Sequence, residues 1–161
     1  MTGDICRFGL IVTGEGEKLF LPRLFRVLMA RAHCVFTVVR RIGQRSPITA
    51  TRRILQMVGT GKRLPTKDEE EIGLPALMFL RKYPGSYAMV VDDLEGSRRG
   101  IANDVFARYR TALDEALRPS ALQSRAAAHF LVNMLEAYYF ADAKCLRKNN
   151  LNKFYFRGES V

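Results

Sequence analysis

Short apolar runs alternate along this chain with segments of helical periodicity, and this order constrains the fold more than any other feature. Each run is rich in β-branched residues and has the length of a buried strand. The runs are Arg7–Thr13, Cys34–Gly43, Ser86–Asp93 and Ala126–Val132. Strands that alternate with helices predict an α/β domain, here a three-layer sandwich with a mainly parallel central sheet of about four strands. Right-handed crossovers place helices on both faces of such a sheet.

The segments between these runs predict the helices. Pro22 fits only the first turn of a helix, so we expect the first helix to begin near Leu21. Further helices are expected at Thr49–Lys62, Asp68–Tyr83, Ala102–Ser120 and Asn133–Leu146. In the 102–120 segment one face is apolar, made of Val105, Phe106, Tyr109, Leu113 and Leu117.

The chain of 161 residues has the length of one domain, with residues 147–161 as a possible tail or the stub of a longer chain. No apolar run approaches the ~20 residues that cross a bilayer. The first residues lack the pattern of a signal peptide. Cys6, Cys34 and Cys145 are widely spaced and odd in number, which suits neither a disulfide framework nor a zinc site. We therefore expect a cytoplasmic protein with no membrane partner.

A strong excess of basic residues, with a formal net charge of +10, indicates a polyanionic partner. No acid lies between Arg40 and Lys67, a stretch that includes Arg41, Arg52 and Arg53. Neutralising phosphates with such residues releases counterions, so nucleic acid is the expected partner. The alternative is a generic basic surface.

Acidic residues follow two of the predicted strands, at the edge where an α/β sheet builds its site. The first strand is followed by Glu15 and Glu17, and the third ends in Asp92 and Asp93, with Glu95 two residues later. Farther along the chain, Glu136 comes after the fourth strand. Converging carboxylates are hard oxygen ligands that suit Mg²⁺ or Mn²⁺. Such an ion beside a basic surface can bind a phosphate and activate water.

Each acid also has a structural interpretation. Glu17 suits a helix N-terminus because of the helix dipole. Asp92 or Asp93 could cap a turn, and Glu95 could pair with Arg98 or Arg99 at helical spacing. Glu136 could be a helix acid that faces water. His129, inside the fourth predicted strand, is interpreted as a core histidine.

Three segments together, "TGEGEKLFLPRLF", "VVDDLE" and "HFLVNMLEAYYFAD", resemble the domain of unknown function 4276 family, which is Toprim-like. Toprim domains place a glutamate after the first strand and an Asp-x-Asp pair after the third, bind Mg²⁺ and act on phosphodiesters. The resemblance extends from about Leu10 to Asp142. It departs at Thr13, which stands at the place of the leading family glutamate, so Glu15 or Glu17 would have to substitute.

The resemblance implies a Toprim-like fold and a Mg²⁺-dependent nuclease or related phosphoryl-transfer enzyme, with bacterial defence as a setting. Its metal ligands would be Glu17, Asp92, Asp93 and Glu95. Its catalytic residues would be Glu17, Asp93 and Glu136, and its nucleic-acid contacts Arg40, Arg41, Arg52, Arg53, Arg98 and Arg99. The alternative is a non-catalytic module that binds nucleic acid or a partner protein within a larger complex. A third interpretation makes the acids a cap and a turn, with the basic face a partner-protein surface.

Overall fold

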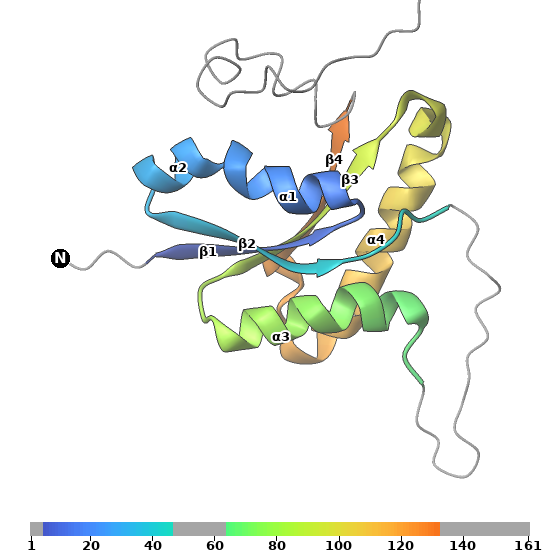
Figure 1. Ribbon diagram of the computed structural model, residues 1–161. Coiled ribbons are helices and arrows are strands. Elements are labelled where there is room, and N and C mark those ends of the chain that lie inside the picture. Colours follow the sequence, from blue (N-terminus) through green and yellow to red (C-terminus); the bar gives the residue numbers. More distant parts are fainter. Residues whose placement is uncertain (1–4, 47–63, 133–161) are drawn as a thin grey trace, which may run out of the picture.

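The computed structural model describes residues 5–46 and 64–132, and it has the predicted α/β fold. The strands are β1 (Cys6–Val12), β2 (Cys34–Arg41), β3 (Tyr87–Leu94) and β4 (Ala126–Val132). All neighbouring strands are parallel, in the order β2-β1-β3-β4 (Figure 1). The four predicted apolar runs are therefore confirmed as strands of one sheet.

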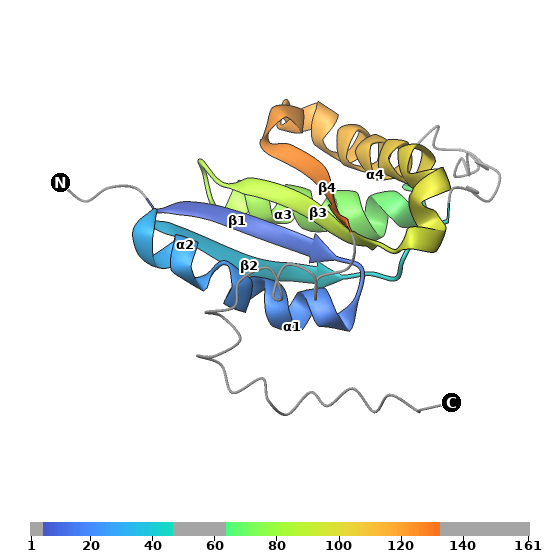
Figure 2. The same ribbon diagram turned by 90° about the horizontal axis from the view of Figure 1, so that it is seen from above.

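Helices cover both faces of the sheet (Figures 1 and 2). One face carries α1 (Glu15–Leu24) and α2 (Arg26–Arg31). The other carries α3 (Leu74–Lys82), which continues the π-helical turn η1 (Glu69–Gly73), and α4 (Ala102–Leu117). Short 3₁₀ turns η2 (Gly96–Ile101), η3 (Arg118–Ser120) and η4 (Gln123–Arg125) flank α4. The three-layer sandwich is confirmed.

Two apolar cores separate the layers. Under α1 lie Leu10, Val12, Leu21, Val91 and Leu131. The core on the other face includes Ile11, Ile72, Val90, Tyr109 and Leu113. Successive residues of β1 and of β3 thus enter different cores, which is the period-two alternation of a strand buried on both faces.

The expected start of the first helix was wrong. α1 begins at Glu15, and Pro22 lies inside it. Proline has no N–H for the helical ladder and crowds the preceding turn, and α1 ends two residues later at Leu24 before α2 restarts at Arg26. Leu21 is on the buried face of α1 and is fully buried, whereas Leu19 is half-exposed.

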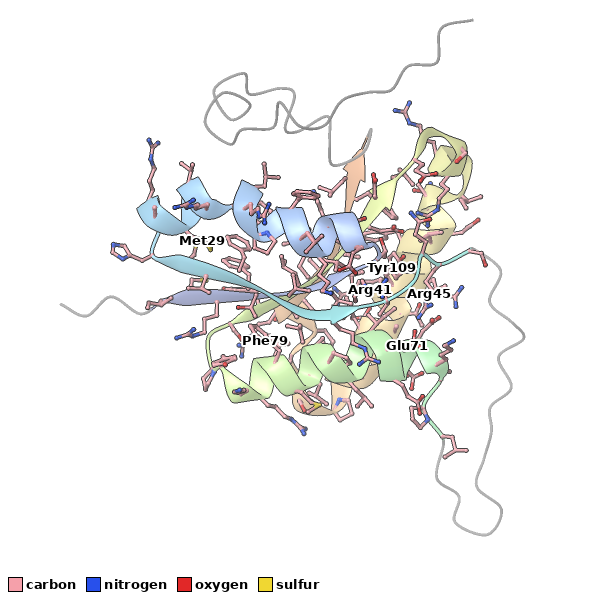
Figure 3. All side chains as sticks on the ribbon, viewed as in Figure 1. Met29, Arg41, Arg45, Glu71, Phe79 and Tyr109 are labelled. Atoms are coloured by element: carbon pink, nitrogen blue, oxygen red, sulfur yellow. The ribbon has the colours of Figure 1, made fainter. Side chains whose placement is uncertain are left out.

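Two glycines permit close contacts that position α3. A Cβ atom at Gly73 would lie 2.3 Å from the Cβ of Ala116 and 2.7 Å from the carbonyl oxygen of Ala112, both in α4. A Cβ at Gly9, in β1, would meet the ring of Phe79 at 2.6 Å. Figure 3 labels Phe79 on α3, beneath the sheet. The absence of a side chain at these positions lets α3 approach both α4 and the sheet.

Two further expectations about burial are corrected. The side chain of His129 is exposed and is not a core histidine. Phe106 is 42% exposed, while the other four apolar residues named on its helix are buried in α4.

Some predictions lie outside the described residues. They are the helices at Thr49–Lys62 and Asn133–Leu146, the 147–161 tail, and the roles of Arg52, Arg53 and Glu136. Within residues 5–46 and 64–132, no helix has the length and apolar character that crossing a membrane requires.

Candidate functional site

The predicted acids that lie within the described residues are at or just after the carboxyl ends of β1 and β3. Glu17 is in the first turn of α1, directly after β1. Asp92 and Asp93 lie inside β3, which runs on to Leu94. They therefore do not cap a turn, and the alternation of the strand sends their side chains to opposite faces of the sheet. The side chain of Asp92 lies on the same face of the sheet as Val90, the face that α4 covers. The side chain of Asp93 lies on the same face as Val91, the face that α1 covers.

Asp92 is fully buried, and both of its carboxylate oxygens are hydrogen-bonded. Oδ1 accepts from the Thr13 hydroxyl at 2.7 Å and from Arg98 at 3.1 Å. Oδ2 accepts from Arg98 at 3.0 Å and from the Tyr109 hydroxyl at 2.8 Å. A carboxylate has about four lone-pair sites, so these donors saturate Asp92. The charge of Arg98 offsets the cost of burying this carboxylate.

The surroundings of Asp92 also hold its donors in their protonated forms. The hydrogen bond to Asp92 raises the pKa of the Arg98 guanidinium. Burial, and to a smaller extent the negative charge of Asp92, raises the pKa of the Tyr109 hydroxyl well above its usual range. Both effects favour the proton that each group donates to Asp92.

Glu17 is the second buried carboxylate at this edge, with an exposed fraction of only 5%. To the part of the chain that the structure describes, it makes one long hydrogen bond, in which its Oε1 lies 3.5 Å from the Thr13 hydroxyl oxygen. Its Oε2 lies over Gly14, where a Cβ atom would be only 2.2 Å away. No lysine or arginine among residues 5–46 and 64–132 forms an ion pair with it. Glu17 and Asp92 thus share Thr13, but only Asp92 has a counter-ion within those residues.

An ionic cluster beside Asp92 fixes the segment that follows β2. Arg98 donates to the carbonyl of Arg45 at 2.9 Å. The Arg45 side chain pairs with Asp68 at 3.0 Å and with Glu71. Arg108 of α4 binds Asp68 at 2.6 Å and also donates to the carbonyl of Ser46. Figure 3 shows Arg45, Glu71 and Tyr109 at the same end of the sheet.

The described basic candidates differ in how accessible they are. Arg40 and Arg41 are exposed at the end of β2, and Arg41 pairs with Glu15 at 3.0 Å. Arg99 is exposed, whereas the side chain of Arg98 is only 13% exposed because it turns inward to Asp92. Arg98 therefore pairs with Asp92 and not with Glu95, which is exposed in the loop after β3.

The arrangement of these acids can be compared with the ligands that a divalent ion requires. Among the described residues, no group of three or more His, Cys, Asp or Glu side chains is placed to hold a metal. Asp92 has no lone pair left for an ion in this arrangement. Mg²⁺, however, is often held by one or two carboxylates and completes its shell with water and substrate phosphates. Glu17 lies in α1, and the alternation of β3 places the side chain of Asp93 on the α1 side of the sheet.

Two members of the site, Thr13 and Tyr109, are not predicted by the sequence patterns. In the sequence Thr13 stands out only as a departure from the Toprim-like pattern, whereas in the structure its hydroxyl lies between Glu17 and Asp92. The helical periodicity predicts that Tyr109 is on the buried face of its helix, but it does not predict the hydrogen bond from its hydroxyl to Asp92. A buried tyrosine usually finds a partner for its hydroxyl, and that rule was the available signal.

Comparison with protein-family models, with curated proteins and with solved structures finds no match to this chain. What the structure establishes is the class of fold, an α/β domain with an all-parallel four-stranded sheet and a polar site at the carboxyl ends of β1 and β3.

Proposed function

We propose that this protein is a Mg²⁺-dependent enzyme of phosphodiester chemistry, a nuclease or a related phosphoryl-transfer enzyme that acts on nucleic acid. One observation carries the proposal: Glu17 is a buried carboxylate at the carboxyl edge of the sheet, and no cation of the described residues pairs with it. Burying a carboxylate without a partner is costly. A bound divalent ion would supply the missing charge.

The chain's own residues would divide the work. Glu17 and Asp93 would hold the ion, and Glu95 could reach it from the loop after β3. Asp92, saturated by its donors, would fix the end of β3 in place and not act as a ligand. When bound, the ion would neutralise a phosphate and lower the pKa of a water. Glu136, which lies outside the described residues, stays a candidate base.

The basic residues near this edge fit a phosphate backbone. Arg40 and Arg41 are exposed at the end of β2, and Arg99 is exposed after β3. Arginine is well suited to phosphate because its planar guanidinium donates in a fixed fork. Residues of this kind position a nucleic acid without reading its sequence.

A second candidate function is a non-catalytic, Toprim-like module that binds nucleic acid or a partner protein. The ion pair of Arg98 with Asp92 favours it, because that pair gives one of the expected metal ligands a permanent counter-ion. This candidate predicts salt-dependent binding of nucleic acid that EDTA does not change.

The two candidates are separated by Mg²⁺ binding and cleavage. Titration calorimetry with Mg²⁺ alone should show binding to the wild type and to Glu15→Gln, and a loss of at least about tenfold in Glu17→Gln. Glu15 is the matched control, since it lies in the same turn but is exposed and pairs with Lys18 at 2.9 Å.

In the cleavage assay, a supercoiled plasmid and a single-stranded RNA serve as substrates.

Cleavage should require Mg²⁺ and be lost in Asp93→Asn. Cleavage that survives both Glu17→Gln and Asp93→Asn would refute the assigned ligands. Nucleic-acid binding without any Mg²⁺ response would establish the non-catalytic candidate instead.

A further inference from the structure

Cys6 and Cys34 are neighbours across the sheet, at the amino ends of their strands and therefore at the edge opposite the candidate site. Their Cα atoms are register partners in the parallel pairing of β1 with β2. The backbone N–H of Cys6 donates to the carbonyl of His33 at 3.1 Å, which holds the two strand starts together. Both residues are thiols, with Cys34 buried and Cys6 partly exposed.

The side chains of these register partners project to the same face of the sheet. The next pair in that row shows how closely such side chains lie. Phe8 and Phe36 are also register partners, and their rings stack with centroids 4.7 Å apart. Neighbouring strands are about 4.7–4.9 Å apart, and disulfides join residues whose Cα atoms are about 4.4–6.8 Å apart. The two cysteines therefore need little backbone movement to form a bond.

We propose that Cys6 and Cys34 form a reversible disulfide when the protein meets an oxidising thiol buffer, with oxidised glutathione as the oxidant. The proposal is independent of the proposed function. Side chains that stand side by side on parallel strands start farther apart than the Cβ atoms of a relaxed disulfide, about 3.8 Å. The bond is therefore expected to be strained and easily reduced, which is the behaviour of a labile disulfide and not of a structural framework.

The disulfide would form in two steps of thiol–disulfide exchange. The thiolate of Cys6, the more accessible thiol, attacks one sulfur of oxidised glutathione and releases one glutathione thiolate. The thiolate of the buried Cys34 then attacks the Cys6 sulfur of this mixed disulfide and releases the second glutathione. The protein loses two electrons and two protons, and one oxidised glutathione becomes two reduced molecules.

The test uses the full chain with Cys145→Ser, so that the third thiol cannot exchange. The folded protein is equilibrated over a series of reduced-to-oxidised glutathione ratios and quenched with acid. Each sample is then alkylated and mapped by mass spectrometry. We expect a Cys6–Cys34 peptide to accumulate at oxidising ratios and to disappear on addition of dithiothreitol.

Cys6→Ser and Cys34→Ser serve as matched controls, and neither should gain a protein disulfide. If Cys34→Ser does not fold, the same peptide map of the chain with only Cys145→Ser still identifies the pair. Accumulation of only a glutathione adduct on Cys6, with Cys34 still a thiol, would overturn the proposal. So would a Cys6–Cys34 bond that forms in urea but not in the folded protein.

Discussion

Arg98 binds Asp92 through two guanidinium nitrogens, one at 3.1 Å from Oδ1 and the other at 3.0 Å from Oδ2. This fork joins the 3₁₀ turn η2 to the end of β3, and the same guanidinium also donates to the carbonyl of Arg45, after β2. The pair thus ties together three segments at the carboxyl edge of the sheet. Arg98 is thus the counter-ion of the fully buried Asp92 carboxylate.

Arg98→Gln should destabilise the protein strongly. Removing one partner of a buried ion pair leaves an uncompensated charge, and such changes cost about 3–5 kcal/mol of unfolding free energy. Urea unfolding followed by circular dichroism measures the loss. Arg118→Gln is the control, because its ion pair with Glu115 is on the surface and Arg118 is 64% exposed. That change should cost less than about 0.5 kcal/mol. Equal losses in the two variants would contradict the structural role given to Arg98.

Thr13→Val should lower the unfolding free energy by about 1–3 kcal/mol, because the valine is close in size but leaves Asp92 without one of its buried donors. Thr13→Ser keeps the hydroxyl and loses only a methyl group, so it should retain most of the stability. The comparison is made by urea unfolding of both variants beside the wild type. If valine and serine proved equally stable, the 2.7 Å hydrogen bond to Asp92 would not contribute as inferred.

The stability of the protein should fall as the pH rises above about 10, where an unperturbed tyrosine begins to lose its proton. In the native state the pKa of Tyr109 is raised by burial and by Asp92, so the folded protein retains a proton that the unfolded chain releases. Because the unfolded state then binds fewer protons, the unfolding free energy decreases with pH.

Tyr109→Phe is the variant that tests this pH dependence. It should be less stable at pH 7, since a donor to Asp92 is lost, and it should show a shallower decline as the pH rises through about 10. Tyr87→Phe, at a 45% exposed position, is the control and should keep the slope of the wild type. An unchanged slope in Tyr109→Phe would show that another group causes the decline.

Gly73→Ala should destabilise the packing of α3 on α4. Its Cβ would come within 2.3 Å of the Cβ of Ala116 and 2.7 Å of a backbone oxygen of α4, so a helix would have to move. Overpacking of this kind costs about 1–3 kcal/mol. Gly16→Ala, in α1, is the matched control, because nothing lies within 4 Å of the position that its new Cβ would occupy. Thermal unfolding should show a lower midpoint for Gly73→Ala and an equal or higher one for Gly16→Ala.

The sequence by itself determined the fold class, because period and composition act locally. The run Ala88–Val91 is apolar on both faces, and this already required a strand covered on both sides. The order of strands and helices then required parallel neighbours. The rule against an internal proline predicted the wrong start for the first helix, because α1 begins at Glu15, contains Pro22 and buries Leu21. The proline penalty, about 3 kcal/mol, is a local property, and it does not include the contacts that the helix makes with the rest of the fold.

Only the tertiary structure decided the roles of the acids. Asp92 and Asp93 are adjacent and chemically identical, so no local pattern separates them. The pleat of β3 sends them to opposite faces, and the donors that reach Asp92 come from residues 13, 98 and 109. Hydrogen-bond saturation depends on which side chains the fold brings within about 3 Å, and contacts between distant segments leave no trace in the local sequence. The folded chain therefore decides that Asp92 has its counter-ion among the described residues and that Glu17 has none there.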